Sequence, residues 1–125
     1  MPISYRIDVE RNLVLTIASG KVTDEEILQH KHRLARDPDF TPGMRELADA
    51  RNIDGVNVTA AGVQAMVQQD RDNSERISPH KLALVISDNA AFGMARMYQA
   101  LTESSMKKVG VFREIEDAKA WLHLK

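Results

Sequence analysis

The sequence contains no cysteine among its 125 residues. This absence excludes disulfide bridges, thiolate zinc sites, iron–sulfur clusters and cysteine nucleophiles. Long apolar runs are also missing, since the longest aliphatic run, Leu82 to Ile86, falls far short of the roughly 20 residues that span a bilayer. Charged residues appear early, by Arg6 and Asp8, without the apolar stretch of a signal peptide. We therefore expect a soluble cytoplasmic protein without an integral membrane segment.

Neither sign of charge is in excess. The chain has 17 basic and 18 acidic residues and a net charge of −1 at pH 7. Proteins dedicated to nucleic acids need a basic surface that displaces counterions from phosphates. Aromatic residues are scarce at 5% and do not interleave with a basic run. The sequence therefore predicts no nucleic-acid partner.

The four histidines do not have the spacing of a metal site. His30 and His32 lie two residues apart in an expected helix, so their side chains point about 200° apart. Paired ligands on a helix need a spacing of three or four. A glycine-rich phosphate loop and a Ser-His-Asp motif in recognisable context are also missing. We expect no metal, no cofactor and no enzymatic activity.

Strand and helix patterns begin at the N-terminus. Residues 5–9 alternate apolar and charged side chains, which is typical of a strand with one solvated face. Residues 13–18 are nearly all apolar, as in a strand buried on both faces, and predict a hairpin with the first strand that ends at Gly20. The segment Thr23-Asp24-Glu25-Glu26 is a capping box, and the helix that it begins ends before Pro38.

The same alternation continues to the C-terminus. The expected elements are a strand over 45–50, a turn at Asp54-Gly55, a helix over 60–70, a strand over 81–87, a helix over 89–105, a strand over 108–112 and a helix over 114–124. The order β-β-α-β-α-β-α-β-α predicts an α/β fold, with helices packed on a mixed sheet of about five strands. We expect one domain over residues 1–125.

Polar residues follow several expected strands. Ligand sites of open α/β sheets lie outside the carboxyl ends of the strands. The candidates for such a site are Asp49, Arg51, Ser87, Asp88, Asn89 and Arg113. Helix capping explains residues 87–89 equally well. A small-molecule site and ordinary capping are both open at this point.

Two residues have unusual positions on expected helices. Thr59 is the N-cap of the helix over 60–70, and it is also a candidate phosphorylation site because a phosphate there would meet free amides and the positive end of the helix dipole. Lys31 falls within an apolar stripe. Its stem can lie along the protein with the ammonium group in water, or its charge can be directed at a site or at a partner's carboxylate.

The helix over 89–105 is unusually apolar. Apolar side chains cover more than half of its circumference, which exceeds the stripe of an ordinary surface helix. It is either deeply buried or it presents a surface to a partner or ligand, for which methionine is well suited. The candidate residues for that surface are Phe92, Met94, Met97, Tyr98 and Leu101.

Several segments, taken together with the element order, carry a family resemblance. They are Thr23-Asp24-Glu25-Glu26-Ile27-Leu28, Asp37-Pro38-Asp39-Phe40, Ala91-Phe92-Gly93-Met94-Ala95-Arg96-Met97-Tyr98, Val111-Phe112-Arg113 and Ala118-Lys119-Ala120-Trp121-Leu122. In these the chain resembles the SpoIIAA-like family of small bacterial proteins. That family is related to the STAS domains of anti-sigma-factor antagonists.

The resemblance implies a non-enzymatic regulatory or protein-interaction module. STAS antagonists are switched by phosphorylation of a hydroxyl residue at the start of the helix after the third strand, and Thr59 matches that place. The partner would be an unidentified protein or a second copy in a homodimer. A wider relation to CRAL-TRIO-type lipid-transfer domains implies an alternative, a carrier of a small apolar ligand or lipid. Its pocket would lie near the strand carboxyl ends and the helix over 89–105.

Overall fold

The computed structural model describes residues 2–77 and 80–124. Its elements are β1 (Ile3–Asp8), β2 (Leu13–Thr23), α1 (Asp24–Arg36), β3 (Arg45–Asn57), α2 (Ala60–Asp72), α3 (Ser74–Ile77), β4 (His80–Ile86), α4 (Asn89–Thr102), β5 (Lys107–Phe112) and α5 (Ile115–Trp121). Within the described residues the strands form a five-stranded sheet in the order β1-β2-β3-β4-β5. β1 is antiparallel to β2, and the other pairs are parallel. The predicted α/β fold with a mixed sheet is confirmed.

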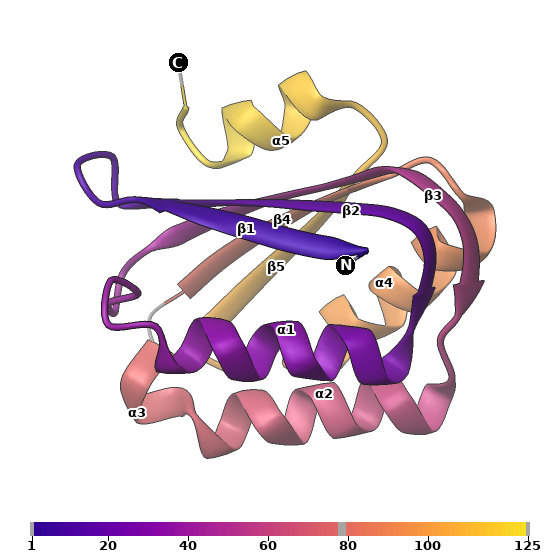
Figure 1. Cartoon of the computed structure of the whole chain (residues 1–125), viewed down its shortest axis with the longest axis horizontal. Coiled ribbons are helices and arrows are strands. Elements are labelled where there is room, and N and C mark those ends of the chain that lie inside the picture. The colour runs from indigo at the N-terminus through magenta and orange to yellow at the C-terminus, as the bar shows by residue number, and fades with distance from the viewer. Residues whose placement is uncertain (1, 78–79, 125) are drawn as a thin grey trace.

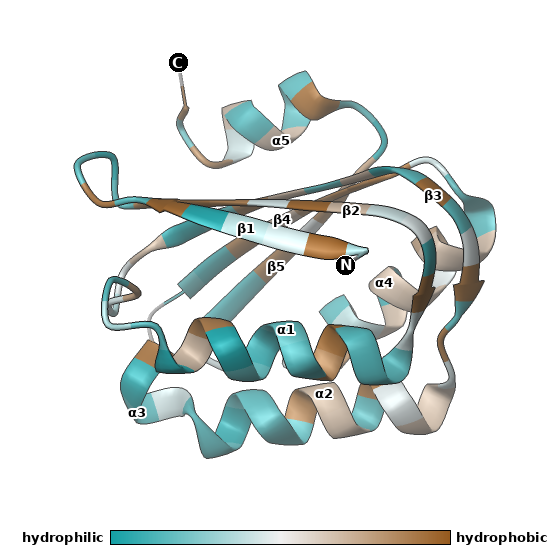
Figure 2. Cartoon of the chain, in the orientation of Figure 1, coloured by the Kyte–Doolittle hydropathy of each residue, from teal (hydrophilic) through white to brown (hydrophobic). Residues whose placement is uncertain are grey.

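The helices cover the two faces of the sheet unequally. Figure 1 shows α5 on one face and α1, α2 and α4 on the other. Alternate residues of a strand point to opposite faces. Leu47 and Ala83 pack in the cluster with α5, whereas the adjacent Ala48 and Leu82 pack toward the other three helices. The strands are accordingly rich in apolar residues, while α1 and α2 carry many hydrophilic ones (Figure 2).

The helices begin at capping residues that can be recognised in the sequence. Thr23 Oγ1 accepts a hydrogen bond from Glu26 N at 3.3 Å, and Glu26 Oε1 accepts one from Thr23 N at 3.0 Å, which confirms the capping box. Thr59 is the N-cap of α2, and Asp88 is the N-cap of α4 with Ala91 N donating to it at 2.9 Å. These caps are readable because both partners lie within one turn of chain.

Strands β2 and β3 are longer than predicted. β2 continues past Gly20, which adopts a φ of 71° beside a register irregularity, where glycine is tolerated. The predicted turn at Asp54-Gly55 is wrong, because Gly55 pairs with Lys21 inside the parallel ladder. Figure 1 shows the extended ends of β2 and β3 curving together toward the starts of α1 and α2.

Some details at the margins also differ from expectation. Ile17 on β2 is 57% exposed, because α5 contacts β3, β4 and β5 and leaves that part of β2 open. The predicted burial of β2 on both faces is therefore wrong at this position. α4 ends at Thr102 and α5 at Trp121, both earlier than predicted, and the short α3 was not predicted. No helix in the described ranges combines the length and apolar character needed to cross a membrane.

Candidate ligand-binding site

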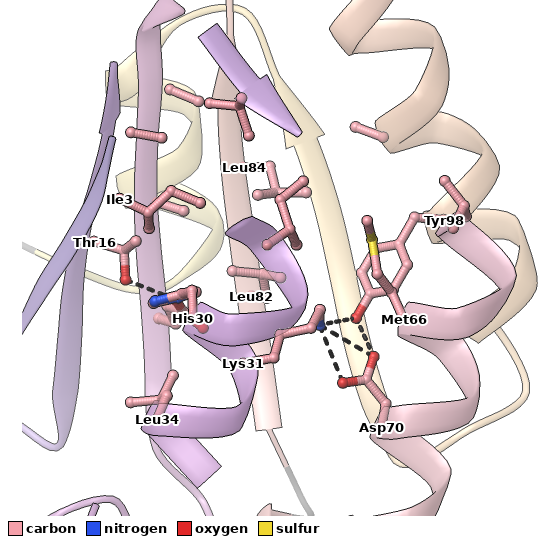
Figure 3. A pocket seen from close by; sticks show the side chains of 18 of the residues that line it. Ile3, Thr16, His30, Lys31, Leu34, Met66, Asp70, Leu82, Leu84 and Tyr98 are labelled. Carbon is pink, nitrogen blue, oxygen red and sulfur yellow. Dashed lines mark hydrogen bonds and ion pairs between the residues drawn. The ribbon is translucent and has the colours of Figure 1, made fainter. Parts of the chain in front are cut away.

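A cavity of about 170 Å³ lies between the sheet and helices α1, α2 and α4. Most of its wall is apolar. Ala48, Leu82 and Leu84 line it from the sheet, and Met66 and Met94 line it from α2 and α4. Figure 3 shows Leu82 and Leu84 pointing toward the helices, with Lys31, Asp70 and the Tyr98 hydroxyl gathered at one end. The cavity therefore has an apolar part and a polar part.

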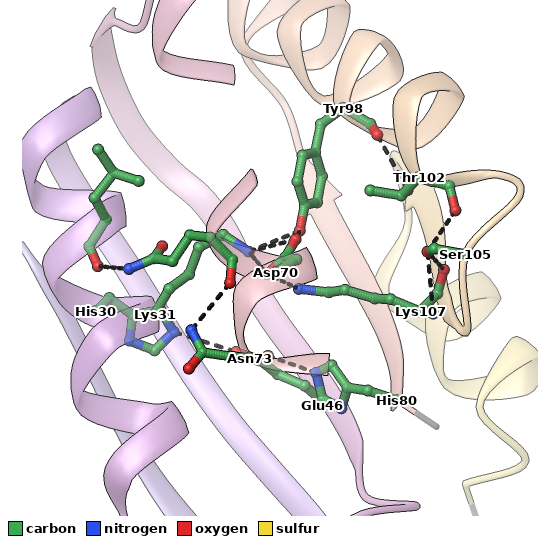
Figure 4. A network of polar contacts seen from close by, with 12 residues as sticks. His30, Lys31, Glu46, Asp70, Asn73, His80, Tyr98, Thr102, Ser105 and Lys107 are labelled. Carbon is green, nitrogen blue, oxygen red and sulfur yellow. Dashed lines mark hydrogen bonds and ion pairs between the residues drawn. The ribbon is translucent and has the colours of Figure 1, made fainter. Parts of the chain in front are cut away.

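One polar region of the cavity wall is a cluster of ionisable side chains that come from three helices and one strand. Lys31 Nζ on α1 lies 3.1 Å from Asp70 Oδ1 on α2 and donates to Tyr98 Oη on α4 at 2.7 Å. Lys107 Nζ at the start of β5 lies 3.2 Å from the same Asp70 oxygen. The Tyr98 hydroxyl donates to Asp70 Oδ2. Figure 3 shows Lys31, Asp70 and Tyr98 converging, and Figure 4 shows Lys107 reaching the same place.

Burial and neighbouring charges shift the pKa values of the four side chains in this cluster in different directions. Burial would raise the pKa of Asp70, but the ammonium groups of Lys31 and Lys107 outweigh it and hold the pKa at about 2. Burial and the charge of Lys31 lower the pKa of Lys107 to about 8. Lys31 keeps a pKa above its ordinary value, because the attraction of Asp70 exceeds the effect of burial. Burial raises the pKa of Tyr98, so its hydroxyl stays a donor.

A second polar cluster surrounds Glu46 on β3 (Figure 4). Thr16 Oγ1 donates to Glu46 Oε2 at 2.7 Å, and His30 Nε2 lies 3.3 Å from that oxygen. His80 Nε2 lies 3.2 Å from Glu46 Oε1, and His80 Nδ1 lies 2.8 Å from Met44 O. Both His80 nitrogens thus face oxygen atoms, one of the backbone and one of Glu46. Despite burial, the hydrogen bonds from the two histidines keep the pKa of Glu46 well below its usual value.

Two buried polar atoms of cavity-lining residues have no hydrogen-bond partner within the described part of the chain. They are His30 Nδ1 and Gln69 Oε1. Leaving a buried polar atom unpaired costs about 1–3 kcal/mol. His30 and Gln69 precede Lys31 and Asp70 directly in sequence, and all four residues line the same cavity. A bound polar group is one way to satisfy such atoms.

The five residues proposed for a surface on α4 do not lie together on one. Tyr98 is only 5% exposed and belongs to the ionisable cluster, and Met94 lines the cavity. Met97 is partly buried against the core. The ring of Phe92 is covered by the Arg113 guanidinium, 3.9 Å from the ring centre, and Leu101 is 42% exposed. Much of the broad apolar arc thus packs into the interior, as the buried-helix alternative describes.

The polar residues at the strand carboxyl ends mostly bond to one another or to backbone. Arg51 donates to both carboxylate oxygens of Asp49, at 2.9 and 2.8 Å. Arg113 donates to Ser87 O at 2.7 Å and to Asn89 Oδ1 at 3.0 Å. Asp88, the remaining candidate, is the N-cap of α4. These contacts account for the polar side chains at this edge by local pairing and capping.

Thr59 lies exposed at the start of α2. Its hydroxyl donates to Asp24 Oδ2 at 2.7 Å and accepts from Gly62 N at 2.9 Å, and its backbone N donates to Asp24 Oδ1 at 3.0 Å. A carboxylate therefore already lies at this helix terminus, where it is favoured by the free amides and the dipole. A phosphate on Thr59 would meet a like charge there.

The charged interior is only partly visible in the sequence. Lys31 stands out by its place in an apolar stripe, and the structure directs its ammonium group inward to Asp70 rather than to water. Glu46 lies two and four residues before Ala48 and Ala50 in β3, so all three share one face of the strand. This spacing indicates that the Glu46 carboxylate faces the core. The spacing of the histidines in the sequence does not show that His30 and His80 contact the same carboxylate, because that carboxylate belongs to Glu46 on another element. Within the described residues no group of three or more His, Asp or Glu is arranged to hold a metal ion.

Comparison with known proteins bears on the fold. The chain matches no protein-family model and no curated protein. Among solved structures it is similar to an uncharacterized protein of the DUF3478 family from Shewanella loihica PV-4, which has a SpoIIAA-like fold. The match covers 96% of this chain and 93% of that chain, with a TM-score of 0.59 and 18% sequence identity. The present chain has a SpoIIAA-like fold.

Within this SpoIIAA-like fold the buried charges lie at an unexpected end of the sheet. Glu46 is the second residue of β3, and His80 and Lys107 are the first residues of β4 and β5. They therefore lie toward the amino ends of the parallel strands, whereas ligand sites in open α/β sheets usually lie at the carboxyl ends. The apolar part of the cavity extends the other way, to Ala50 and Ile86. The candidate site thus runs under the sheet rather than across its edge.

Proposed function

We propose that this domain binds a small amphipathic molecule in the cavity beneath the sheet, as a non-enzymatic carrier or sensor. The observation that carries the proposal is the pairing of an apolar wall with a buried ionisable cluster in one cavity. Buried ion pairs rarely stabilise a fold more than apolar residues of similar volume. Perturbed ionisable groups gathered at a cavity are instead typical of functional sites.

The size of the cavity limits the ligand. Its volume of about 170 Å³ is similar to the ~150 Å³ of an engineered apolar cavity that binds benzene. A compact organic molecule fits this space. A long acyl chain does not, so the proposal narrows the lipid alternative to ligands of small size.

The test is mass spectrometry of the protein purified from its own organism, first native and then denatured. Extra mass that is lost on denaturation is expected, and its value limits the identity of the ligand. Leu84→Phe, which narrows the cavity, should reduce the bound fraction. Leu101→Phe makes the same change on the outer part of α4 and should leave it unchanged. A wild-type protein without bound mass, and without saturable binding of any compact amphipathic compound, contradicts the proposal.

A second candidate is regulatory interaction with a protein partner or a second copy. It is supported by exposed apolar side chains after the buried part of α4, with Leu101 42% and Met106 62% exposed, and by the exposed hydroxyl of Thr59. Sedimentation of the wild type and of a Leu101→Asp, Met106→Asp variant tests it. The variant should lose any self-association that the wild type shows, and Thr59→Glu should alter it if the hydroxyl acts as a switch.

A further inference from the structure

We infer that the cavity takes a small monocarboxylate, with its carboxylate group against the ammonium groups of Lys31 and Lys107 and its apolar part along the sheet. This inference rests on the proposed binding function and names the class of ligand. It follows from the balance of charge in the cavity, from the geometry of the two lysines and from the shape of the apolar part.

The two lysines share one anion. Both Nζ atoms contact the same oxygen, Asp70 Oδ1, at 3.1 and 3.2 Å. The other oxygen of Asp70 accepts from the Tyr98 hydroxyl and from Lys31. One carboxylate therefore serves two buried ammonium groups. An uncompensated buried charge is costly, so this arrangement favours a further anion beside Lys107.

Glu46, the other buried carboxylate of the cavity, is already engaged. Its oxygens accept from Thr16 and face the ring nitrogens of His30 and His80. Among the described contacts, the carboxylate that meets both Lys31 and Lys107 is that of Asp70. A ligand with a single carboxylate would give the second ammonium group a partner of its own.

The rest of the wall determines the shape of the ligand. Beyond the lysines the lining is Ala48, Leu82, Leu84 and Met94, followed by Ile86 toward the carboxyl ends of the strands. An apolar chain or ring of the ligand would lie along these side chains, of which Figure 3 labels Leu82 and Leu84. The volume of about 170 Å³ limits that apolar part to about the size of a benzene ring. Hexanoate is a suitable probe, and 1-hexanol is its uncharged counterpart.

The experiment is a calorimetric titration of both probes into the wild type, Lys107→Met and Lys108→Met. Lys108 is the matched control, because it is exposed and donates to the backbone oxygens of Glu103 and Ser105 outside the cavity. We expect the wild type and Lys108→Met to bind hexanoate at least about tenfold more tightly than hexanol. Lys107→Met should lose that preference while it still binds hexanol.

The outcomes separate the two proposals. Equal affinity for hexanoate and hexanol in the wild type overturns the monocarboxylate inference and leaves small-molecule binding intact. An unchanged preference in Lys107→Met also overturns it. Binding of neither probe overturns the inference, and it contradicts the binding function as well if native mass spectrometry also shows no bound mass.

A second measurement does not depend on the folding of a variant. Hexanoate is ionised at both pH 7.0 and pH 9.5, whereas Lys107 loses its proton over this range because burial and Lys31 lower its pKa to about 8. The other charged or titratable groups that face it are Lys31 on α1, Asp70 on α2, Tyr98 on α4, Glu46 on β3 and His80 on β4. The wild-type preference for hexanoate should fall at the higher pH. A constant preference overturns the inference.

Discussion

The Asp24 carboxylate accepts hydrogen bonds from both the backbone amide and the hydroxyl of Thr59, at 3.0 and 2.7 Å, across 35 residues of chain. Asp24 is the first residue of α1, and Thr59 is the N-cap of α2. The contact therefore joins the starts of two neighbouring helices at the point where β2 and β3 end. It also leaves little space around Gly62, since a Cβ there would overlap the Asp24 carboxyl group.

Gly62→Ala should destabilise the protein by about 1–3 kcal/mol, because the new methyl group displaces the Asp24 side chain. The cost should shrink in an Asp24→Ala background, and a double-mutant cycle from urea unfolding measures this coupling. Gly93→Ala is the matched control. It lies in α4, where an added methyl group would meet open space, so it should stabilise by about 0.5–1 kcal/mol. Additive effects at positions 24 and 62 would contradict the steric account.

Asp70→Asn should be strongly destabilising. It leaves the ammonium groups of Lys31 and Lys107 buried without their shared carboxylate, and breaking a buried ion pair in this way costs about 3–5 kcal/mol. Urea unfolding at pH 7 measures the change. Asp72→Asn, two residues later on α2, is the control and should change stability little, because the hydrogen bond described for the Asp72 carboxylate comes from the exposed Gln68 side chain. Removing both lysines together with Asp70 should restore much of the loss, and a failure to do so argues against unpaired charge as its cause.

Acid should unfold the protein through the carboxylates of Glu46 and Asp70. Asp70 has a pKa of about 2, and that of Glu46 is also lowered in the fold. In the unfolded chain a carboxyl group titrates near pH 4. A depressed carboxyl pKa gives stability that is complete above the unfolded value and is lost as pH falls through the folded value. The free energy of unfolding should therefore decline from about pH 5 toward pH 2, and a smaller decline in the Glu46→Gln variant checks the share of that residue.

Lys107 should make the protein more stable as the pH rises through the alkaline range. Its pKa is lowered to about 8 in the fold, below its ordinary value, so between these limits the unfolded chain binds more protons than the folded one. Stability then rises with pH in this window. Unfolding measured between pH 7.5 and 9.5 should show this rise in the wild type and not in Lys107→Met. A Lys107→Met curve that parallels the wild type would show that another group is responsible.

The parts of the fold that sequence predicted depend on neighbouring residues. The capping box at Thr23, the N-cap at Thr59, the helix cap within residues 87–89 and the alternation of strands and helices all depend on residues within a few positions of one another. The turn predicted at Asp54-Gly55 failed because pairing between distant parts of the chain overrode a local turn signal. The extended end of β2 offers Lys21 as a partner, and the ladder continues through Gly55.

The candidate site was the harder part, because its groups are far apart in sequence. Lys31 and Asp70 are separated by 39 residues, and Lys31 and Tyr98 by 67. A helical wheel shows that Lys31 is misplaced for a surface residue, but it does not say which carboxylate it meets. The search at the carboxyl ends of the strands found residues such as Arg113 and Asn89 that bond to each other. Tyr98 was identified as a candidate, although its partners inside the core were not.

The order β1-β2-β3-β4-β5 has a consequence for cooperativity. Each parallel strand is added beside the one before it, so a chain docked only as far as β4 already has most of its sheet. Asp70 would then hold Lys31 alone, and the polar end of the cavity would be open to water at the place where Lys107 later enters. Docking of β5 thus buries the Lys107 ammonium group. That charge is stable in the interior only when α1, α2 and α4 are already in position. Partly assembled forms are penalised, and the domain should fold and unfold as a single unit.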